Sequence, residues 1–244
     1  MIAGATAETR NESGESSVRA APHPARFAPY TNGETVMTAV IRLAAPRDGA
    51  ALAAIYRPAV VDSAISFEYE PPDASAMTER VSSTLAHLPW IVCESGGDIA
   101  GYAYAGRYRD RTAYQWSVEV SAYVRQDVRR AGVARALYAS LFSILVLQGF
   151  RNAYAGITLP NDASVGLHRA VGFTPIGVYR GVGHKLGSWH DVAWFDRSLS
   201  PRDPNPVPPL SLPHLMDTPA FLDALAAGTP HLRPPIAHDD SSGL

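Results

Sequence analysis

Six consecutive residues, Arg129-Arg130-Ala131-Gly132-Val133-Ala134, have the types and spacing of a turn that binds phosphate. Apolar residues alternate over 118–124 before this turn, which predicts a strand, and leucines recur every four residues from Leu137 to Leu145, which predicts a helix. The first N–H groups of a helix have no partner within it and carry the positive end of its dipole, so Gly132 would let a diphosphate approach the main chain. An ordinary strand-turn-helix connection with solvated arginines has the same residues, and both interpretations stay open at this point.

Asn161 and Gly172 bracket a second predicted helix, over 163–171. Asn161 follows the strand-like run 153–159 after one proline, so its side chain could cap the helix or bond to a ligand beside it. Gly172 suits the left-handed position that ends a helix, and Phe173 leads into another strand. The spacing predicts a second strand-to-helix junction with a polar side chain at its start.

Glu119 and His168 are the candidates for proton transfer. In an alternating strand, Glu119 faces the same side as Ser117, Ser121 and Tyr123, whereas the apolar residues face the other side. A solvated strand face is the other explanation of that pattern. His168, on the helix 163–171, can donate a proton near neutral pH, or it is a partly buried histidine whose nitrogens bond to the backbone.

Three arginines, Arg107, Arg109 and Arg111, alternate along the segment before Tyr114. Guanidinium groups bind carboxylate or phosphinate through paired hydrogen bonds, so these residues could hold an acidic acceptor. A solubilising hairpin tip is the alternative, and it fits Arg107 better than the other two.

The rest of the pattern predicts a mixed α/β domain. Helices are expected near 48–60, 73–87, 133–147 and 163–171, and strands at 40–43, 90–95, 99–104, 112–124, 152–159, 173–180 and 190–198. Cys93 is the single cysteine and lies within the expected strand 90–95, so we expect a buried small side chain and no thiol nucleophile. No spacing of His, Cys, Asp and Glu matches a known metal site, and we expect no metal.

Composition indicates one folded domain of ordinary character. A chain of 244 residues with 46% hydrophobic residues can bury one good core. The formal net charge of −2 gives no footprint for nucleic acid, and no apolar run has the length of a membrane span. We therefore expect neither a nucleic-acid partner nor a membrane partner, and a cytoplasmic protein.

The ends differ from the middle, so the expected division is 1–37, 38–199 and 200–244. Residues 1–37 lack periodicity and the apolar centre of a signal peptide, and are expected to be disordered, with Met37 as an alternative start. Half of the 20 prolines lie in 200–244, which favours extended structure over a packed core, with a short helix possible at 218–227.

Together, the two turn-and-helix segments resemble the GNAT superfamily of N-acetyltransferases. Both of its signatures are present in order: Arg-x-x-Gly-x-Ala at 129–134, and Asn-x-x-Ser at 161–164 followed by Gly-Phe at 172–173. Further segments are similar to the phosphinothricin and methionine sulfoximine acetyltransferases, namely 65–72, 101–106, 113–119, 148–150, 156–167 and 185–192. The resemblance covers about residues 40–199. It implies a twisted, largely antiparallel sheet whose two central parallel strands splay apart, and a homodimer with the site near the interface.

The resemblance also assigns residues to acetyl-CoA. The pantetheine arm would bond to the backbone at Ala122, Tyr123 and Val124. The pyrophosphate end would meet Arg130, Ala131, Gly132, Val133, Ala134 and Arg135, with Asn161 as a further cofactor-binding residue.

Catalytic and acceptor-binding roles are implied in the same way. Glu119 matches the proposed catalytic glutamate of the family, and His168 lies where many members carry a tyrosine that protonates the thiolate, with Tyr123 as a substitute donor. On the acceptor side, Arg109 occupies the position of a basic residue, Arg111 and Tyr114 match an arginine and its aromatic neighbour, and Phe67 would shape the pocket.

These assignments predict an acetyl-CoA-dependent N-acetyltransferase that acts on the α-amine of phosphinothricin, methionine sulfoximine or methionine sulfone by direct attack. One alternative is acetylation of another small amine or an antibiotic. The other is a non-catalytic acyl-CoA-binding module whose Pro-rich tail recruits a partner.

Overall fold

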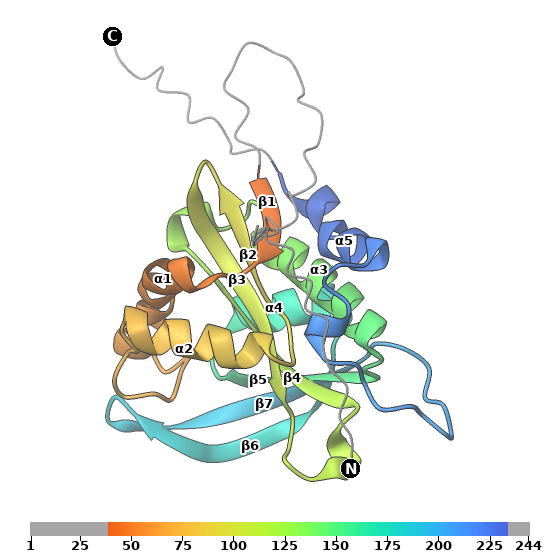
Figure 1. Ribbon diagram of the computed structural model, residues 1–244. Helices are drawn as coiled ribbons and strands as arrows, with labels where there is room; N and C mark the ends of the chain where they lie inside the picture. Colours follow the sequence, from red (N-terminus) through yellow and green to blue (C-terminus); the bar gives the residue numbers. More distant parts are fainter. Residues whose placement is uncertain (1–38, 234–244) are drawn as a thin grey trace, which may run out of the picture.

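A seven-stranded sheet forms the centre of the computed structural model, which describes residues 39–233 (Figure 1). The strand order is β1-β2-β3-β4-β5-β7-β6. The strands are β1 (Ala39–Leu43), β2 (Trp90–Ser95), β3 (Asp98–Arg107), β4 (Ser117–Val124), β5 (Asn152–Thr158), β6 (Thr174–Lys185) and β7 (Ser188–Ser198). Only β4 and β5 pair in parallel within the described residues, so the expected mixed, mostly antiparallel sheet is confirmed. The expectations for 1–37 and for the end of the tail lie outside the described residues.

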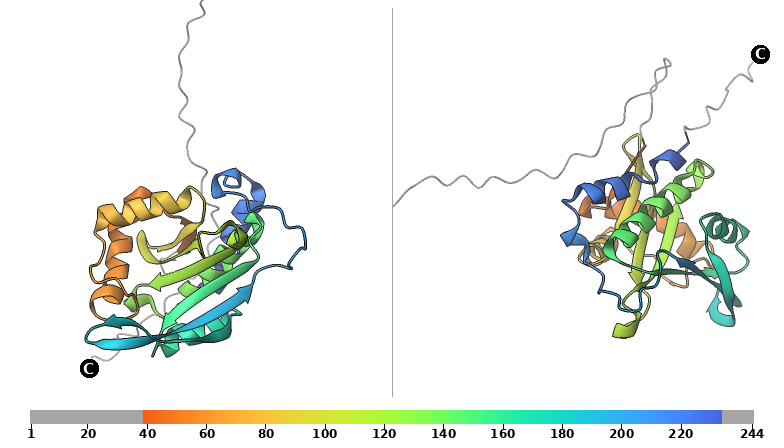
Figure 2. Two further views of the ribbon diagram at one scale, coloured as in Figure 1. Left: turned by 90° about the horizontal axis from the view of Figure 1, so that it is seen from below. Right: turned by 90° about the vertical axis from the view of Figure 1, so that its right-hand side faces the viewer.

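Helices cover both faces of the sheet (Figure 2). On one side lie α1 (Gly49–Val61) and α2 (Ala74–Leu85), and on the other lie α3 (Val133–Gln148), α4 (Asp162–Ala170) and α5 (Pro219–Ala226). Alternation along β2 divides its side chains between the two cores, because Trp90 and Val92 pack with α1 and α2 whereas Ile91 and Cys93 pack on the face of α3. Across residues 39–233, none of the helices is long and apolar enough to cross a membrane.

Cys93 is fully buried in the core, as expected from its place in an apolar strand. Burial raises the pKa of its thiol to about 11, which disfavours the nucleophilic thiolate. The side chain therefore serves as a small apolar group.

The two central strands separate partway along their length. β4 and β5 pair at Ser117, Val118 and Glu119 and then stop, although β4 continues to Val124 and β5 to Thr158. Each strand keeps its outer partner along the remaining length, β3 for β4 and β7 for β5. The resulting opening begins after Glu119 and extends to the ends of both strands.

The expected strand 112–124 is shorter than predicted. Thr112–Tyr114 form a 3-10 turn, in which Tyr114 N–H donates to Arg111 O at 2.9 Å, and the strand begins only at Ser117. β3 ends at Arg107 and pairs antiparallel with β4, so the chain reverses between them, and the 3-10 turn is part of that reversal.

The C-terminal segment, residues 212–233, differs more strongly from expectation. Leu212, Leu215, Phe221 and Ala224 are buried in the same core as α3, whereas the proline content favoured unpacked chain. The short helix expected near 218–227 is present as α5, and Thr218 caps it by accepting from Phe221 N–H at 3.2 Å. The described part of the tail thus consists of an extended connection, residues 200–211, and the longer folded segment 212–233.

Candidate functional site

The segment 129–134, here called the phosphate loop, leads into α3 and includes the first two residues of that helix, so the predicted turn at a helix N-terminus is present. Gly132 is the residue that precedes the helix, and its φ of 80° is left-handed, as is that of Arg130 at 72°. Within the described residues, the N–H groups of Arg130 and Gly132 make no hydrogen bond. They lie at the positive end of the α3 dipole, where an anion is stabilised.

Ala122, Tyr123 and Val124 lie in the unpaired half of β4, between Glu119 and the phosphate loop. Peptide groups on the edge of β4 that faces β5 have no strand partner there in the described part of the chain. An extended amide-containing ligand could take the place of a strand in this opening. Along the chain, Glu119 is thus followed by the unpaired half of β4 and then by the phosphate loop.

Asn161 lies at the end of β5, at the same open end of the sheet. Its Oδ1 accepts from Ser164 N–H at 3.1 Å and caps α4, which is one of the two roles that the sequence left open. At the other end of α4, Gly172 has a φ of 89°, so the predicted left-handed termination is confirmed.

Glu119 lies at the vertex of the opening. It pairs with Tyr154 across β4 and β5, and its carboxylate makes no hydrogen bond or salt bridge within residues 39–233. Burial raises the pKa of Glu119, and the positive charge of Arg109 partly offsets that rise. A carboxylate with a raised pKa and an uncommitted oxygen is a suitable general base.

His168 is buried, and both of its ring nitrogens are engaged. Nδ1 lies 2.8 Å from Ser164 O, which can only accept, so the proton is on Nδ1. Nε2, 2.9 Å from the Tyr138 hydroxyl, therefore accepts from it. Burial lowers the pKa of His168 and favours this neutral form. The geometry favours the second of the two interpretations that the sequence left open, a histidine satisfied by its surroundings.

The three arginines before Tyr114 line the same cavity, but only Arg109 acts on the pKa of Glu119. Arg109 lies close enough to Glu119 to affect its pKa, and its guanidinium lies 4.4 Å from the centre of the Tyr108 ring. Arg107, Arg111 and Tyr114 line a neighbouring cavity of about 290 Å³, which Arg109 also borders. Of the three arginines, Arg109 is thus the one whose charge acts on the Glu119 carboxylate, and it also lines this cavity.

Phe67 packs against the β6–β7 hairpin. Its ring lies where a side chain at Gly183 would stand, and 6.3 Å from the ring of His190. None of the contacts among the described residues joins Phe67 to Glu119 or Arg109. Its predicted role in shaping the acceptor pocket remains a prediction.

A polar network beside the Glu119 face of the sheet was missed by the sequence reasoning. The Tyr56 hydroxyl lies 2.6 Å from Ser66 Oγ and donates to Glu68 at 3.0 Å, and Arg80 binds both Glu68 oxygens at 2.8 and 2.9 Å. Tyr56 and Arg80 line a cavity of about 180 Å³ with Tyr104, which pairs with Ser121 of β4. The alternation of Tyr102 and Tyr104 in the sequence could have predicted that tyrosine side chains line one side of this cavity.

Lys185 is a second residue that the sequence did not single out. It is 3% exposed, and its Nζ donates to Val60 O at 2.6 Å and to Ser66 O at 2.5 Å. The cation thereby ties the β6–β7 hairpin to the end of α1 and to the polar network. Among the described residues, no cluster of three His, Cys, Asp or Glu side chains could hold a metal ion.

Comparison with known proteins identifies this arrangement. Residues 41–194 match the model of the acetyltransferase (GNAT) domain. The chain is 38% identical over 172 residues to a phosphinothricin N-acetyltransferase of Streptomyces viridochromogenes, covering 70% of this chain and 94% of the relative. It is 33% identical over 168 residues to a methionine sulfoximine and methionine sulfone acetyltransferase of Pseudomonas aeruginosa, covering 68% and 97%.

A solved structure agrees with these sequence relatives. The phosphinothricin acetyltransferase of Sinorhizobium meliloti, determined in complex with acetyl-CoA, is similar with a TM-score of 0.68 and 33% identity, over 75% of this chain and all of that one. The family expected from the two signatures is therefore confirmed, and the chain belongs to the GNAT acetyltransferase family.

Proposed function

We propose that this chain transfers an acetyl group from acetyl-CoA to the α-amine of a small amino acid with a second polar or acidic oxygen group. Phosphinothricin, methionine sulfoximine and methionine sulfone are the proposed acceptors, because relatives named for them are 38% and 33% identical to this chain. The observation that carries the proposal is the opening of the sheet, which begins at Glu119 and leads toward the phosphate loop.

The residues present fit acetyl-CoA, which supplies an acyl group activated as a thioester. N–H groups at Arg130 and Gly132 and the α3 dipole would bind the pyrophosphate, with Arg135 adding charge. The strand edge at 122–124 would bond to the amides of the pantetheine arm, and Asn161 would contact it from the β5 side. This order along β4 would bring the thioester to the level of Glu119.

Glu119 would act as the general base. An α-ammonium group has an ordinary pKa near 7.7–8.0, so a carboxylate of raised pKa can remove its proton at neutral pH, directly or through water. The freed amine then attacks the thioester carbonyl, the carbon–sulfur bond breaks, and the thiolate takes up a proton. The products are an amide and a free thiol.

Protonation of the thiolate has two candidate donors, His168 and Tyr123. The engaged nitrogens of His168 favour Tyr123, which is on the Glu119 side of β4 and whose pKa burial raises well above the ordinary value, so that the phenol keeps its proton. No covalent acyl-enzyme is required by this scheme.

Acceptor recognition would rest on Arg109, with Arg111 and Tyr114 at the edge of the adjoining cavity. A thiol-release assay over a panel of acceptors tests the function as a whole. We expect turnover with phosphinothricin, methionine sulfoximine or methionine sulfone, and much weaker turnover with neutral amines of similar size. Turnover of neutral amines alone would move the assignment to another small amine, and acetyl-CoA binding without turnover would support a non-catalytic module.

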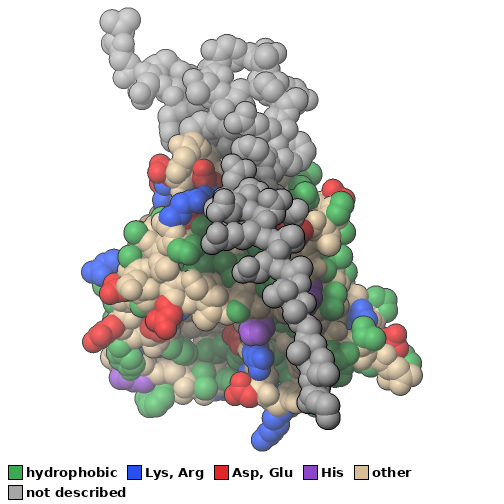
Figure 3. Space-filling model, in the orientation of Figure 1, with side chains coloured by type: hydrophobic (Ala, Val, Ile, Leu, Met, Phe, Trp, Pro, Cys, Tyr) green, Lys and Arg blue, Asp and Glu red, His purple; other side chains and the backbone are tan. Residues whose placement is uncertain are grey.

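We also propose a homodimer, in the cytoplasm, where acetyl-CoA and free amino acids are both present. β6 is an edge strand whose apolar side chains face solvent, with Ile176 57%, Val182 52% and Trp189 of the adjoining strand 70% exposed (Figure 3). Val182→Glu should shift the mass measured by light scattering from dimer to monomer. Val207→Glu, an equally drastic change at an exposed site in the extended connection, should not.

A further inference from the structure

The C-terminal segment, residues 212–233, is fastened to α3 by main-chain contacts. Ser140 is fully buried, and its Oγ donates to Leu225 O at 2.7 Å and accepts from Gly228 N–H at 3.0 Å. A side chain at Gly228 would collide with the carbonyl of Ala136, so the glycine allows the close approach. The segment lies beyond residue 194, where the match to the family domain ends.

The end of this segment reaches the phosphate loop. The N–H of Arg233 donates to Ala131 O at 3.0 Å, and the carbonyl of His231 lies where a side chain at Gly132 would stand. These contacts use a carbonyl and the Cα side of the loop. They leave the N–H groups of Arg130 and Gly132 available for phosphate.

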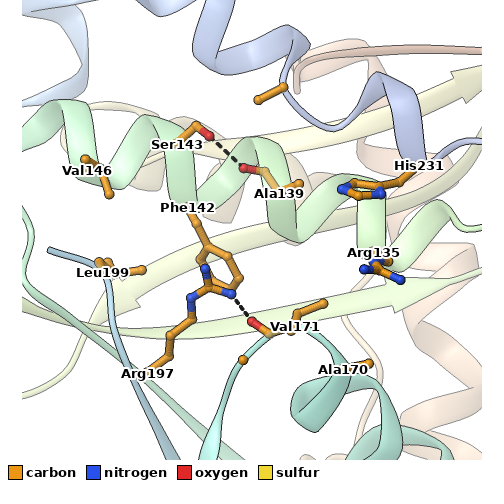
Figure 4. Close-up of a pocket in the computed structure, with 12 residues that line it drawn as sticks. Arg135, Ala139, Phe142, Ser143, Val146, Ala170, Val171, Arg197, Leu199 and His231 are labelled. Carbon is orange, nitrogen blue, oxygen red and sulfur yellow. Dashed lines mark hydrogen bonds between the residues drawn. The ribbon is translucent and has the colours of Figure 1, made fainter.

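A groove of about 690 Å³ runs along the outer side of α3 from this point (Figure 4). Residues of α3, the end of α4 and β7 form its floor and one wall, and Ala227 and His231 of the C-terminal segment form the other. Its size is that of a site for a small molecule such as a nucleotide.

The groove is positively charged. Arg135 lies at the end beside the phosphate loop, Arg197 lies in the middle, and no acidic residue is among those that line it. The Arg197 guanidinium lies 4.3 Å from the Phe142 ring centre and donates to Val171 O, and neither arginine has a carboxylate partner among the described residues. Arg197 is partly buried, and a buried charge without an opposite charge is costly, so an anion in the groove would stabilise it.

We propose that this groove binds the 3′-phosphorylated adenosine end of acetyl-CoA and that the C-terminal segment supplies one of its walls. The inference rests on the proposed function, which places the pyrophosphate at the phosphate loop and the pantetheine arm between β4 and β5. The nucleotide must then leave the loop in another direction, and the groove begins there with matching charge. His231 would donate a hydrogen bond to the ribose or its phosphate.

The test compares acetyl-CoA with 3′-dephospho-acetyl-CoA, which lacks only the phosphate in question. Dissociation constants for both ligands are measured by calorimetry for the full chain and for variants at Ala227, which is exposed and lines the groove. Wild type should bind acetyl-CoA roughly tenfold more tightly than the dephospho form. Ala227→Glu should bring that ratio close to one, whereas Ala227→Gln, matched in size, should keep it.

Two histidines of the same segment provide a second comparison. His231→Gln should lower the ratio several-fold, and His214→Gln, outside the groove, should leave it unchanged. A ratio that is unchanged in both Ala227→Glu and His231→Gln, with acetyl-CoA still bound, would overturn this inference and leave the transferase assignment standing. Failure of wild type to bind either ligand would refute the proposed function and this inference with it.

Discussion

Replacement of Glu119 by glutamine should lower turnover without lowering the stability of the fold. Glutamine has the same shape and retains one carbonyl oxygen, but it cannot accept a proton from an ammonium group. Because the Glu119 carboxylate has no hydrogen-bond or salt-bridge partner within the described residues, the substitution removes no contact that holds the fold. Turnover should fall while the folded structure is unaffected.

The sign of the stability effect follows from the pKa. Burial raises the pKa of Glu119 in the folded chain, so above the ordinary carboxyl pKa the unfolded chain releases this proton first. The unfolded state then binds fewer protons, and the free energy of unfolding decreases as pH rises through the folded pKa. At neutral pH the charged carboxylate opposes folding, and Glu119→Gln should be as stable as wild type or slightly more stable.

The expected loss of turnover is a hundredfold or more, typical of a removed general base. At 1.36 kcal/mol for each factor of ten, this corresponds to about 2.7 kcal/mol of transition-state stabilisation. Stopped assays of thiol release and thermal unfolding of the same samples measure the two effects. The acid limb of the profile of kcat/KM against pH should also move in the variant, from the pKa of Glu119 to that of the acceptor's α-ammonium group, near 7.7–8.0. Wild-type turnover in a folded Glu119→Gln protein, or an unchanged acid limb, would refute the assignment.

Three further changes probe the rest of the site. Gly132→Val should weaken acetyl-CoA binding at least tenfold by calorimetry, because its side chain both obstructs the phosphate loop and meets the His231 carbonyl in a left-handed conformation; unchanged affinity would remove the loop from the site. His168→Phe should lower the free energy of unfolding by about 1–3 kcal/mol, because the Tyr138 hydroxyl loses its acceptor, and it should reduce turnover only mildly. Since burial lowers the pKa of His168, wild type should also lose stability as pH falls below about 6.5, and unfolding titrations should show a smaller loss in that variant. Arg109→Ala should raise the KM for phosphinothricin about tenfold to a few hundredfold and that for acetyl-CoA little, with a smaller effect from Arg111→Ala; equal effects on a neutral amine would count against acceptor binding by either arginine.

Elements with a clear period were predictable from sequence alone. The leucine spacing placed α3, the alternating residues placed β4, and the apolar run 90–93 placed β2. Gly172 ended α4 in the left-handed conformation that only glycine adopts readily. Alternation also put Glu119 on a different face from Val118 and Val120, and the structure buries those valines against α3. These features depend on residues that are near one another in the sequence, so the local pattern was enough to predict them.

Features that depend on distant segments were not predictable. The opening at Glu119 exists because β4 and β5 stop pairing, and the residues of neither strand alone indicate where pairing stops. It was expected only from the family resemblance. The polar network joins Tyr56, Glu68 and Arg80, and Lys185 reaches the same region from a hairpin far along the chain. Likewise, nothing in the spacing of Arg107, Arg109 and Arg111 says which of them comes near Glu119.

The folded C-terminal segment shows how position can outweigh composition. Half of the prolines lie in 200–244, and proline is unfavourable inside helices because it lacks an N–H group. In residues 212–233, however, Pro213, Pro219 and Pro230 each occupy the first turn of a helical element, where the N–H would have no partner in any case. There proline favours helix initiation, and Leu212, Leu215 and Phe221 supply the apolar contacts that pack the segment onto α3. Because the same contacts carry the chain to Ala131 of the phosphate loop, the segment lies against that loop rather than extending away from the domain.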